Sequence, residues 1–219
     1  MKKQELAKFI DHTFLKPAGE ADAVKRLCRE AKRYGFASVC VNPSEVPLAA
    51  RLLKKSDVAV CTVIGFPLGA TSVVAKYYEA VDAIANGATE LDFVVNQRLL
   101  KYDPELCFNE LDVLSQLCHA EKPGVVLKLI LECCNLTKAE IVRGCRLAKK
   151  AKFDFVKTST GFGAGGATVE DVRLMRRTVG PKMGVKAAGG IRDRATALAM
   201  VAAGANRLGA SAGMALLKE

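Results

Sequence analysis

Charged side chains interrupt four consecutive apolar segments of the sequence, and these charges are the first candidates for chemistry. They are Asp92, Lys128, Lys157 and Lys186, each within a run that otherwise reads as a buried strand. A buried lone charge is costly unless it is paired or changes its protonation state. The pattern therefore indicates either an internal salt-bridge network that only satisfies itself or a site with chemically tuned side chains.

The lysines favour the second interpretation. Three ammonium groups face few carboxylates, although the period of a strand places Glu132 on the same face as Lys128. Crowded cations favour the neutral form of at least one amine. A neutral lysine amine is a nucleophile, and its natural reaction is Schiff-base formation with a carbonyl.

Glycine-rich segments indicate where a phosphate would bind. They follow the last three predicted strands, at residues 160–166, 189–192 and 209–213, and the last two lead into predicted helices. Free backbone N–H groups and the helix dipole favour an anion at such positions. In α/β barrels, the loops after the seventh and eighth strands commonly hold phosphate.

The first of these segments also matches a dinucleotide-binding pattern, Gly161-x-Gly163-x-x-Gly166. A polar Thr-Ser-Thr separates it from the preceding strand. That fingerprint also requires an acidic residue about 20 positions later, and none is present there. We interpret the segment as a flexible substrate loop and not as a cofactor site.

The elements that must position these residues alternate regularly along the chain. Strands are predicted at residues 12–15, 36–41, 58–64, 90–95, 125–131, 153–157, 184–187 and 206–208. Helices are predicted at residues 3–9, 22–34, 44–54, 71–86, 104–120, 138–151, 169–178, 194–203 and 211–217. Eight such units predict one α/β domain over residues 1–219, a (β/α)8 TIM barrel with a short extra N-terminal helix. An open doubly wound sheet is the alternative.

Composition narrows the class of partner. The 219 residues are 50% hydrophobic and 26% charged, which is typical of a globular protein with a large core. The net charge of +10 is compatible with nucleic acid, a membrane surface or a small anionic substrate. Nucleic-acid binding is disfavoured because tryptophan is absent and aromatic residues are only 6%.

The N-terminal sequence and the placement of the cysteines favour a reduced, cytoplasmic protein. No apolar segment follows Lys2 and Lys3, and no run reaches the length of a transmembrane helix. The eight cysteines lie mostly in apolar or helix-like stretches, as free core cysteines do. His12 and His119 are the only histidines, and no zinc-ligand spacing is present, so we expect no metal and no cofactor.

Several segments, taken in order, resemble the deoxyribose-phosphate aldolase family over nearly the whole chain. The segments are residues 10–17, 39–43, 63–69, 90–96, 128–132, 154–162, 184–192 and 207–211. The most specific are Lys157-Thr158-Ser159-Thr160-Gly161 and Lys186-Ala187-Ala188-Gly189-Gly190. The resemblance implies a (β/α)8 class I aldolase. Such an enzyme reversibly cleaves 2-deoxyribose 5-phosphate to glyceraldehyde 3-phosphate and acetaldehyde, without a metal.

The resemblance also implies roles for individual residues. Lys157 matches the Schiff-base lysine, Lys186 the second lysine whose charge favours the neutral amine of Lys157, and Asp92 the aspartate that transfers protons with an ordered water. The phosphate-binding matches are Gly161, Gly189, Gly190, Arg192, Gly209 and Ser211. Thr13, Cys40 and Thr158 match positions along the substrate channel, with barrel packing as the alternative for Cys40, and Lys128 matches a lysine in a supporting interior network.

Two departures from the family pattern bear on activity. Ala212 stands where many members have a second serine, so one hydroxyl contact to phosphate is lost. The chain ends at residues 216–219 without the C-terminal tyrosine that some members use as a proton shuttle, so water or another group must take that part.

The resemblance implies a small sugar phosphate and acetaldehyde as partners, a homodimer or homotetramer, and neither nucleic acid nor membrane. Another Schiff-base aldolase, acting on a different sugar phosphate, is the alternative function. A non-catalytic barrel is disfavoured because Lys157, Lys186 and Asp92 are all present.

Overall fold

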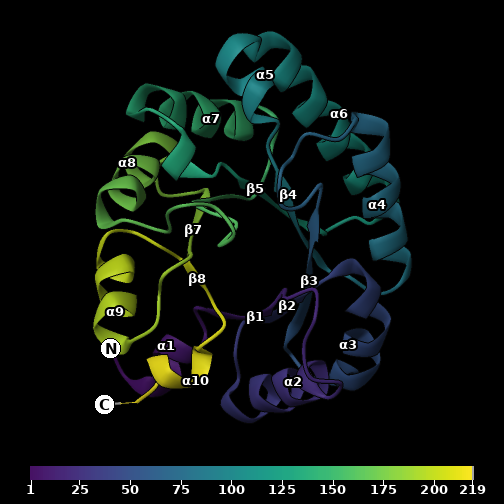
Figure 1. Ribbon diagram of the computed structural model, residues 1–219, viewed down its shortest axis with the longest axis vertical. Helices are drawn as coiled ribbons and strands as arrows, with labels where there is room; N and C mark the ends of the chain where they lie inside the picture. The colour runs from purple at the N-terminus through teal and green to yellow at the C-terminus, as the bar shows by residue number, and fades with distance from the viewer. Residues whose placement is uncertain (219) are drawn as a thin grey trace.

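Eight short parallel strands form a closed barrel in the computed structural model, which describes residues 1–218 (Figure 1). The strands are β1 (Ile10–Phe14), β2 (Ser38–Val41), β3 (Ala59–Ile64), β4 (Glu90–Val94), β5 (Val126–Ile130), β6 (Phe155–Lys157), β7 (Gly184–Ala188) and β8 (Arg207–Ala210). Each strand pairs with its neighbours in sequence, and β8 pairs back with β1. The predicted TIM barrel is confirmed, and the open sheet is wrong. Glu219, the last residue of the predicted tyrosine-free C-terminus, lies outside the described residues.

Helices cover the outside of the barrel (Figure 1). They are α1 (Lys3–Ala7), α2 (Ala23–Tyr34), α3 (Val46–Leu53), α4 (Val73–Ala85), α5 (Gln97–Tyr102), α6 (Pro104–Glu121), α7 (Lys138–Lys150), α8 (Val169–Val179), α9 (Arg194–Ala202) and α10 (Gly213–Leu216). No helix within residues 1–218 is long and apolar enough to span a membrane.

Several predicted boundaries are wrong at the ends of elements. Helix α5 was not predicted, and it forms because the side chain of Asn96 accepts a hydrogen bond from the N–H of Leu99 at its start. The helix predicted at residues 44–54 divides into a 3-10 turn at Pro43–Glu45 and α3. The last predicted helix is shorter, since α10 begins after a turn at residues 211–212 and ends at Leu216.

Local capping chemistry explains where other helices begin and end. Thr137 and Glu140 form the predicted capping box of α7, in which each side chain accepts a hydrogen bond from the other residue's N–H. Asp103 caps α6 by accepting from the N–H of Leu106. Gly35 ends α2 with a φ of 65°, a conformation that a residue with a Cβ rarely adopts.

The barrel interior pairs large side chains with glycines on adjacent strands. A Cβ at Gly184 would lie 2.1 Å from the ring of Phe155, which fills the barrel two residues before Lys157 on β6. A Cβ at Gly209 would lie 2.9 Å from Cβ of Ala188 and 3.3 Å from Cε of Lys186. Gly209 therefore leaves space inside the barrel for the long side chain of Lys186, apart from any part in phosphate binding.

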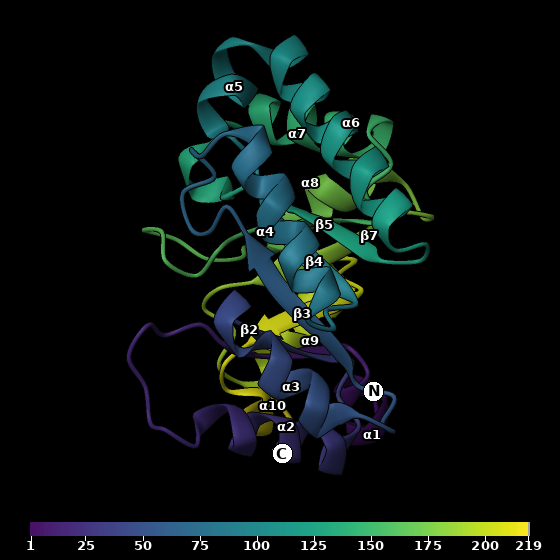
Figure 2. The ribbon, with the colours of Figure 1, turned by 90° about the vertical axis from the view of Figure 1, so that its right-hand side faces the viewer.

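The loops that follow the strands gather at one end of the barrel. Figure 2 shows the segments after β1 and β6, purple and green at the left, extending from the same side of the molecule. Active sites of such barrels are built from these carboxyl-end loops. The fold therefore places the glycine-rich segments and the ends of the lysine-bearing strands at a common opening.

The contact between Gly184 and Phe155 gives a test of the interior packing. Gly184→Ala should lower the free energy of unfolding by about 1–3 kcal/mol, because an added methyl group overpacks the interior. The same change in a Phe155→Ala background should be much less destabilising, because the ring is gone. Urea denaturation of the four proteins measures both values, and equal losses in the two backgrounds would contradict this packing.

Candidate active site

One buried carboxylate, on Asp92 of β4, accepts hydrogen bonds from three lysines. Its Oδ2 accepts from Nζ of Lys157 at 2.8 Å and from Nζ of Lys186 at 2.7 Å. Its Oδ1 accepts from Nζ of Lys128 at 2.9 Å. Strand register explains the convergence: Asp92 lies opposite Lys128, and Lys157 lies opposite Lys186, so all four side chains enter the barrel at adjacent positions.

A second set of charges lies beside this cluster and was missed by sequence reasoning. Asp11 pairs with Lys186 at 2.6 Å, and Glu90 pairs with Lys128 at 2.6 Å. Arg207 bridges the two carboxylates, at 2.5 Å from Asp11 and 2.8 Å from Glu90. The available signal was strand periodicity, since Glu90 stands two residues before Asp92 and Arg207 two before Gly209. Four cationic side chains thus face three carboxylates within residues 1–218, a closer balance than the sequence suggested.

The pairing fixes the charge of the supporting residues. Burial opposes ionisation of Asp92, but the ammonium groups of Lys128, Lys157 and Lys186 outweigh it and hold the pKa of that carboxyl well below its usual range. Burial likewise opposes the charge on Lys186, yet Asp11 and Asp92 raise its pKa well above the ordinary value. The pKa of Lys128 is also raised, because Asp92 and Glu90 outweigh burial. Lys128 and Lys186 are therefore charged at neutral pH, and neither supplies a neutral amine.

A cavity of about 400 Å³ opens at the carboxyl ends of the strands. Of the three clustered lysines, Lys157 alone lines it in the structure of residues 1–218. The predicted substrate residues that also line it are Thr13, Gly161, Gly189, Gly190, Arg192, Gly209 and Ser211. The fold therefore brings the predicted nucleophile and the predicted phosphate-binding residues to one cavity.

Three other predicted substrate residues lie behind the cavity wall. The hydroxyl of Thr158 donates to the carbonyl of Ala188 at 3.1 Å and accepts from its N–H at 3.0 Å, which ties the ends of β6 and β7 together. Cys40 packs in a small apolar cluster with Leu15, Cys61 and Val63. Lys128 is enclosed by its ion pairs. A direct contact between these three residues and substrate stays a prediction.

The cavity also has lining residues that sequence reasoning did not single out. Lys16 follows β1 and adds an exposed cation to Arg192, which favours an anionic ligand at the opening. Phe162 lines the cavity and contacts Phe66 edge to face, with ring centroids 5.2 Å apart. A basic residue directly after a barrel strand was the signal for Lys16, whereas nothing in the sequence paired Phe162 with Phe66.

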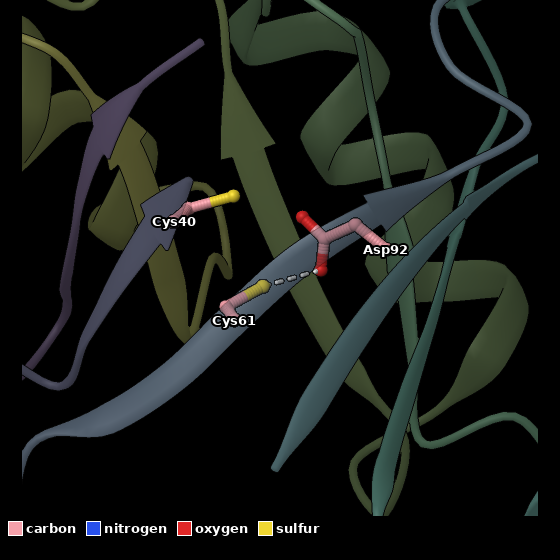
Figure 3. A group of neighbouring side chains, drawn as sticks. All are labelled: Cys40, Cys61 and Asp92. Atoms are coloured by element: carbon pink, nitrogen blue, oxygen red, sulfur yellow. Dashed lines mark hydrogen bonds between the residues drawn. The ribbon is translucent and has the colours of Figure 1, made fainter. Parts of the chain in front are cut away.

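Cys40, Cys61 and Asp92 form the one group in residues 1–218 whose ligand atoms could surround a metal, all within 4.8 Å of one another. Figure 3 shows both thiols directed toward Asp92, with Cys61 donating a hydrogen bond to its carboxylate at 3.3 Å. Burial, the hydrogen bond that Cys61 donates to Cys40 and the charge of Asp92 raise the pKa of the Cys61 thiol well above its ordinary value, which disfavours the thiolate that a metal requires at this position. The ammonium groups on Asp92 would also repel a cation, so these residues fit a divalent ion poorly.

Comparison with known proteins places the chain among aldolases. The model of the DeoC/LacD family of aldolases matches residues 6–219. The deoxyribose-phosphate aldolase of Clostridium perfringens is 55% identical over 216 residues, which cover 99% of this chain and 96% of the relative. That of Thermococcus gammatolerans is 53% identical over 216 residues, covering 98% and 96%.

Solved structures agree with these matches. A putative deoxyribose-phosphate aldolase from Coccidioides immitis has a TM-score of 0.93 and 41% identity, covering 99% of this chain and 86% of that one. A deoxyribose phosphate aldolase from Aeropyrum pernix, described as tetrameric, has a TM-score of 0.92 and 35% identity, covering 99% and 91%. The family that the sequence motifs resemble is thereby confirmed.

The shifted pKa values predict how stability depends on pH. Asp11 and Asp92 have lowered pKa values in the folded state, so their contribution is present above the unfolded value of about 4 and is lost as pH falls below it. Lys128 and Lys186 have raised pKa values, so theirs is present below about 10.4 and is lost as pH rises above it. Urea denaturation across pH should show a plateau between about pH 5 and 9 that falls on both sides.

A matched variant isolates the contribution of the cluster. Asp92→Ala should lower the free energy of unfolding at pH 7 by about 3–5 kcal/mol, because it leaves Lys157 without a carboxylate and Lys128 and Lys186 with one each. It should also reduce the loss of stability in acid. An Asp92→Ala protein as stable as the wild type at pH 7 would contradict the ion pairing described here.

Proposed function

The chain belongs to the DeoC/LacD family of aldolases, and we propose that it reversibly cleaves 2-deoxyribose 5-phosphate to glyceraldehyde 3-phosphate and acetaldehyde through a Schiff base on Lys157. The observation that carries the proposal is the position of Lys157, which lines the cavity while its Nζ contacts the carboxylate it shares with Lys186. The relatives from Clostridium perfringens and Thermococcus gammatolerans, both named deoxyribose-phosphate aldolase, support this substrate.

In the cleavage direction, the neutral amine of Lys157 attacks the aldehyde carbon of the open-chain sugar and, after loss of water, leaves an iminium. The iminium withdraws electrons from the bond between the second and third carbons of the sugar. As the hydroxyl on the third carbon loses its proton, that bond breaks, glyceraldehyde 3-phosphate leaves, and its electrons form an enamine on Lys157. Protonation of the enamine and addition of water then release acetaldehyde and restore the lysine. Synthesis follows the same steps in reverse.

Asp92 and Lys186 are the groups proposed to move the protons. Oδ2 of Asp92 contacts both Nζ atoms, so a proton that leaves Lys157 has an acceptor beside it and a charged donor 2.7 Å from that acceptor. A water held by Asp92 and Lys186 would protonate the enamine carbon. The fixed charge of Lys186 repels an ammonium on Lys157 and favours the nucleophilic amine.

The opening of the cavity supports a phosphate at the other end of the substrate. Gly189, Gly190 and Gly209 bring backbone close to the cavity without side chains, and Arg192 and Lys16 add positive charge. Ser211 offers a hydroxyl, whereas Ala212 beside it offers none. We infer that the phosphate is held by these loops while the aldehyde end reaches Lys157.

The setting of the enzyme is also part of the proposal. A homo-oligomer is proposed, supported by the relative from Aeropyrum pernix that is described as tetrameric. A single domain is proposed because the barrel closes on itself. A cytoplasmic location is proposed because seven of the eight cysteines, all of them free, are buried.

Chemical trapping tests the nucleophile. Borohydride reduction in the presence of acetaldehyde should attach a two-carbon unit to Lys157, because hydride reduces the iminium to a stable amine. Peptide mass spectrometry locates the label, and Lys157→Ala should abolish both labelling and the cleavage of deoxyribose 5-phosphate. Labelling that persists in Lys157→Ala would refute the assignment. Hydroxyacetone as a better donor than acetaldehyde would favour a different Schiff-base aldolase.

A second test addresses Lys186. Lys186→Leu should raise the pH needed for trapping on Lys157, because the neighbouring positive charge that favours the free amine is removed. Lys16→Met is the matched control: it removes a cavity cation outside the Asp92 cluster, so the pH dependence of trapping should stay as in the wild type. Trapping rates measured between about pH 6 and 10 distinguish the two, and an unchanged profile for Lys186→Leu would count against its role.

A further inference from the structure

Glu132 combines two unfavourable features at one position. It is only 5% exposed, and among residues 1–218 its carboxylate has no cationic partner. Its backbone has a φ of 55°, in the left-handed region that residues with a Cβ rarely adopt. Strand periodicity predicted it beside Lys128, but β5 ends at Ile130 and the turn directs Glu132 elsewhere. Such an outlier persists only where surrounding contacts hold it, and it is a reason to look for a function.

Neighbouring side chains hold the turn at Glu132 in place. Nε2 of Gln97 donates to the carbonyl of Leu131 at 2.9 Å and to that of Glu132 at 3.4 Å. Asn135 in turn donates to Oε1 of Gln97 at 3.1 Å. The start of α5 therefore fixes the backbone that aims the Glu132 side chain.

The carboxylate of Glu132 accepts its closest hydrogen bonds from Thr160, three positions after Lys157, and a longer one from Sγ of Cys134 at 3.9 Å. It accepts from the N–H of Thr160 at 3.3 Å and, in a short contact, from its hydroxyl. The same hydroxyl accepts from the N–H of Phe162 at 3.0 Å. Hydrogen bonds to a charged acceptor are stronger than neutral ones. Glu132 therefore clamps the backbone between the predicted nucleophile and Phe162.

The glycine-rich segment 161–167 is attached at both ends. Near its start, a Cβ at Gly163 would lie 3.0 Å from the carboxyl carbon of Glu132, so glycine allows close packing there. At its end, the N–H of Ala167 donates to the carbonyl of Gly189 at 3.0 Å, and a Cβ at Gly166 would meet that oxygen at 2.3 Å. Thr160, Gly161 and Phe162, at the start of this stretch, line the cavity.

We propose that Glu132 is a positioning residue of the aldolase reaction: through Thr160 it holds segment 161–167 as the cavity wall that Gly161 and Phe162 present to the sugar phosphate. The proposal rests on the proposed function for its substrate. It separates two steps. Schiff-base formation with free acetaldehyde needs Lys157, Asp92 and Lys186 and is independent of the wall, whereas binding and cleavage of the phosphorylated sugar require it.

Variants of Glu132 test this separation. Glu132→Gly removes the carboxylate and relieves the left-handed backbone, so thermal stability should not fall. The KM for deoxyribose 5-phosphate should rise about 10- to 100-fold, the range for losing a hydrogen bond to a charged group. Borohydride trapping of acetaldehyde on Lys157 should stay within about twofold of wild type, because the Asp92 cluster is untouched. Glu132→Asn, a residue that also tolerates this conformation, is the second variant if the glycine protein does not fold.

Two further variants identify Thr160 as the intermediary. Glu132→Gln keeps an oxygen acceptor at the same place and should recover most of the lost affinity. Thr160→Val should raise the KM as Glu132→Gly does. The double variant should have a KM no higher than that of the more affected single variant, because both changes break the same interaction.

Each outcome bears on a different part of the proposal. A Glu132→Gly protein with unchanged KM, or one in which trapping, cleavage and stability fall together, overturns the role of Glu132 alone. A wild-type protein that traps no acetaldehyde and cleaves no deoxyribose 5-phosphate overturns the proposed function, and the positioning role with it.

Discussion

The structure depends on one constraint: the carboxylate of Asp92 is buried inside a closed barrel, so the ammonium groups of the neighbouring strands must compensate its charge. Replacing a buried ion pair by apolar side chains is often neutral in stability, whereas removal of one partner is strongly destabilising. Each member of the cluster is therefore tied to the others, and the strands that carry them must keep their register. The glycines of the interior serve the same constraint, since Gly209 leaves the volume that Lys186 occupies and Gly184 admits the ring of Phe155.

The interior separates fixed charges from the residue proposed to react. Lys128 and Lys186 each contact two carboxylates, and both are enclosed. Lys157 contacts only Asp92 among residues 1–218 and reaches the cavity. Three lysines on adjacent strands thus differ in the number of carboxylates around them and in their access to solvent. That difference, rather than residue type, distinguishes a supporting lysine from a proposed nucleophile.

Much of the fold could be predicted because eight apolar runs alternate with amphipathic segments, a pattern with few solutions. Asp92, Lys157 and Lys186 stood out because each is a charge in an apolar strand. Asp11, Glu90 and Arg207 did not, because a charge near the start of a strand can equally face solvent. Glu132 was assigned to the wrong neighbour because period-two reasoning assumes an extended backbone, and a single left-handed residue redirects a side chain. Thr158 and Cys40 were identified by resemblance to the family, and a resemblance does not show which neighbouring side chains separate them from the cavity.

The surplus of one positive charge in the interior has an electrical consequence. With Lys157 protonated, the seven charged side chains of the cluster sum to one positive charge. When Lys157 releases its proton, they sum to zero. The nucleophilic amine and the electroneutral interior are therefore the same state. The local charge balance of the barrel interior therefore changes with the one clustered lysine that reaches the cavity.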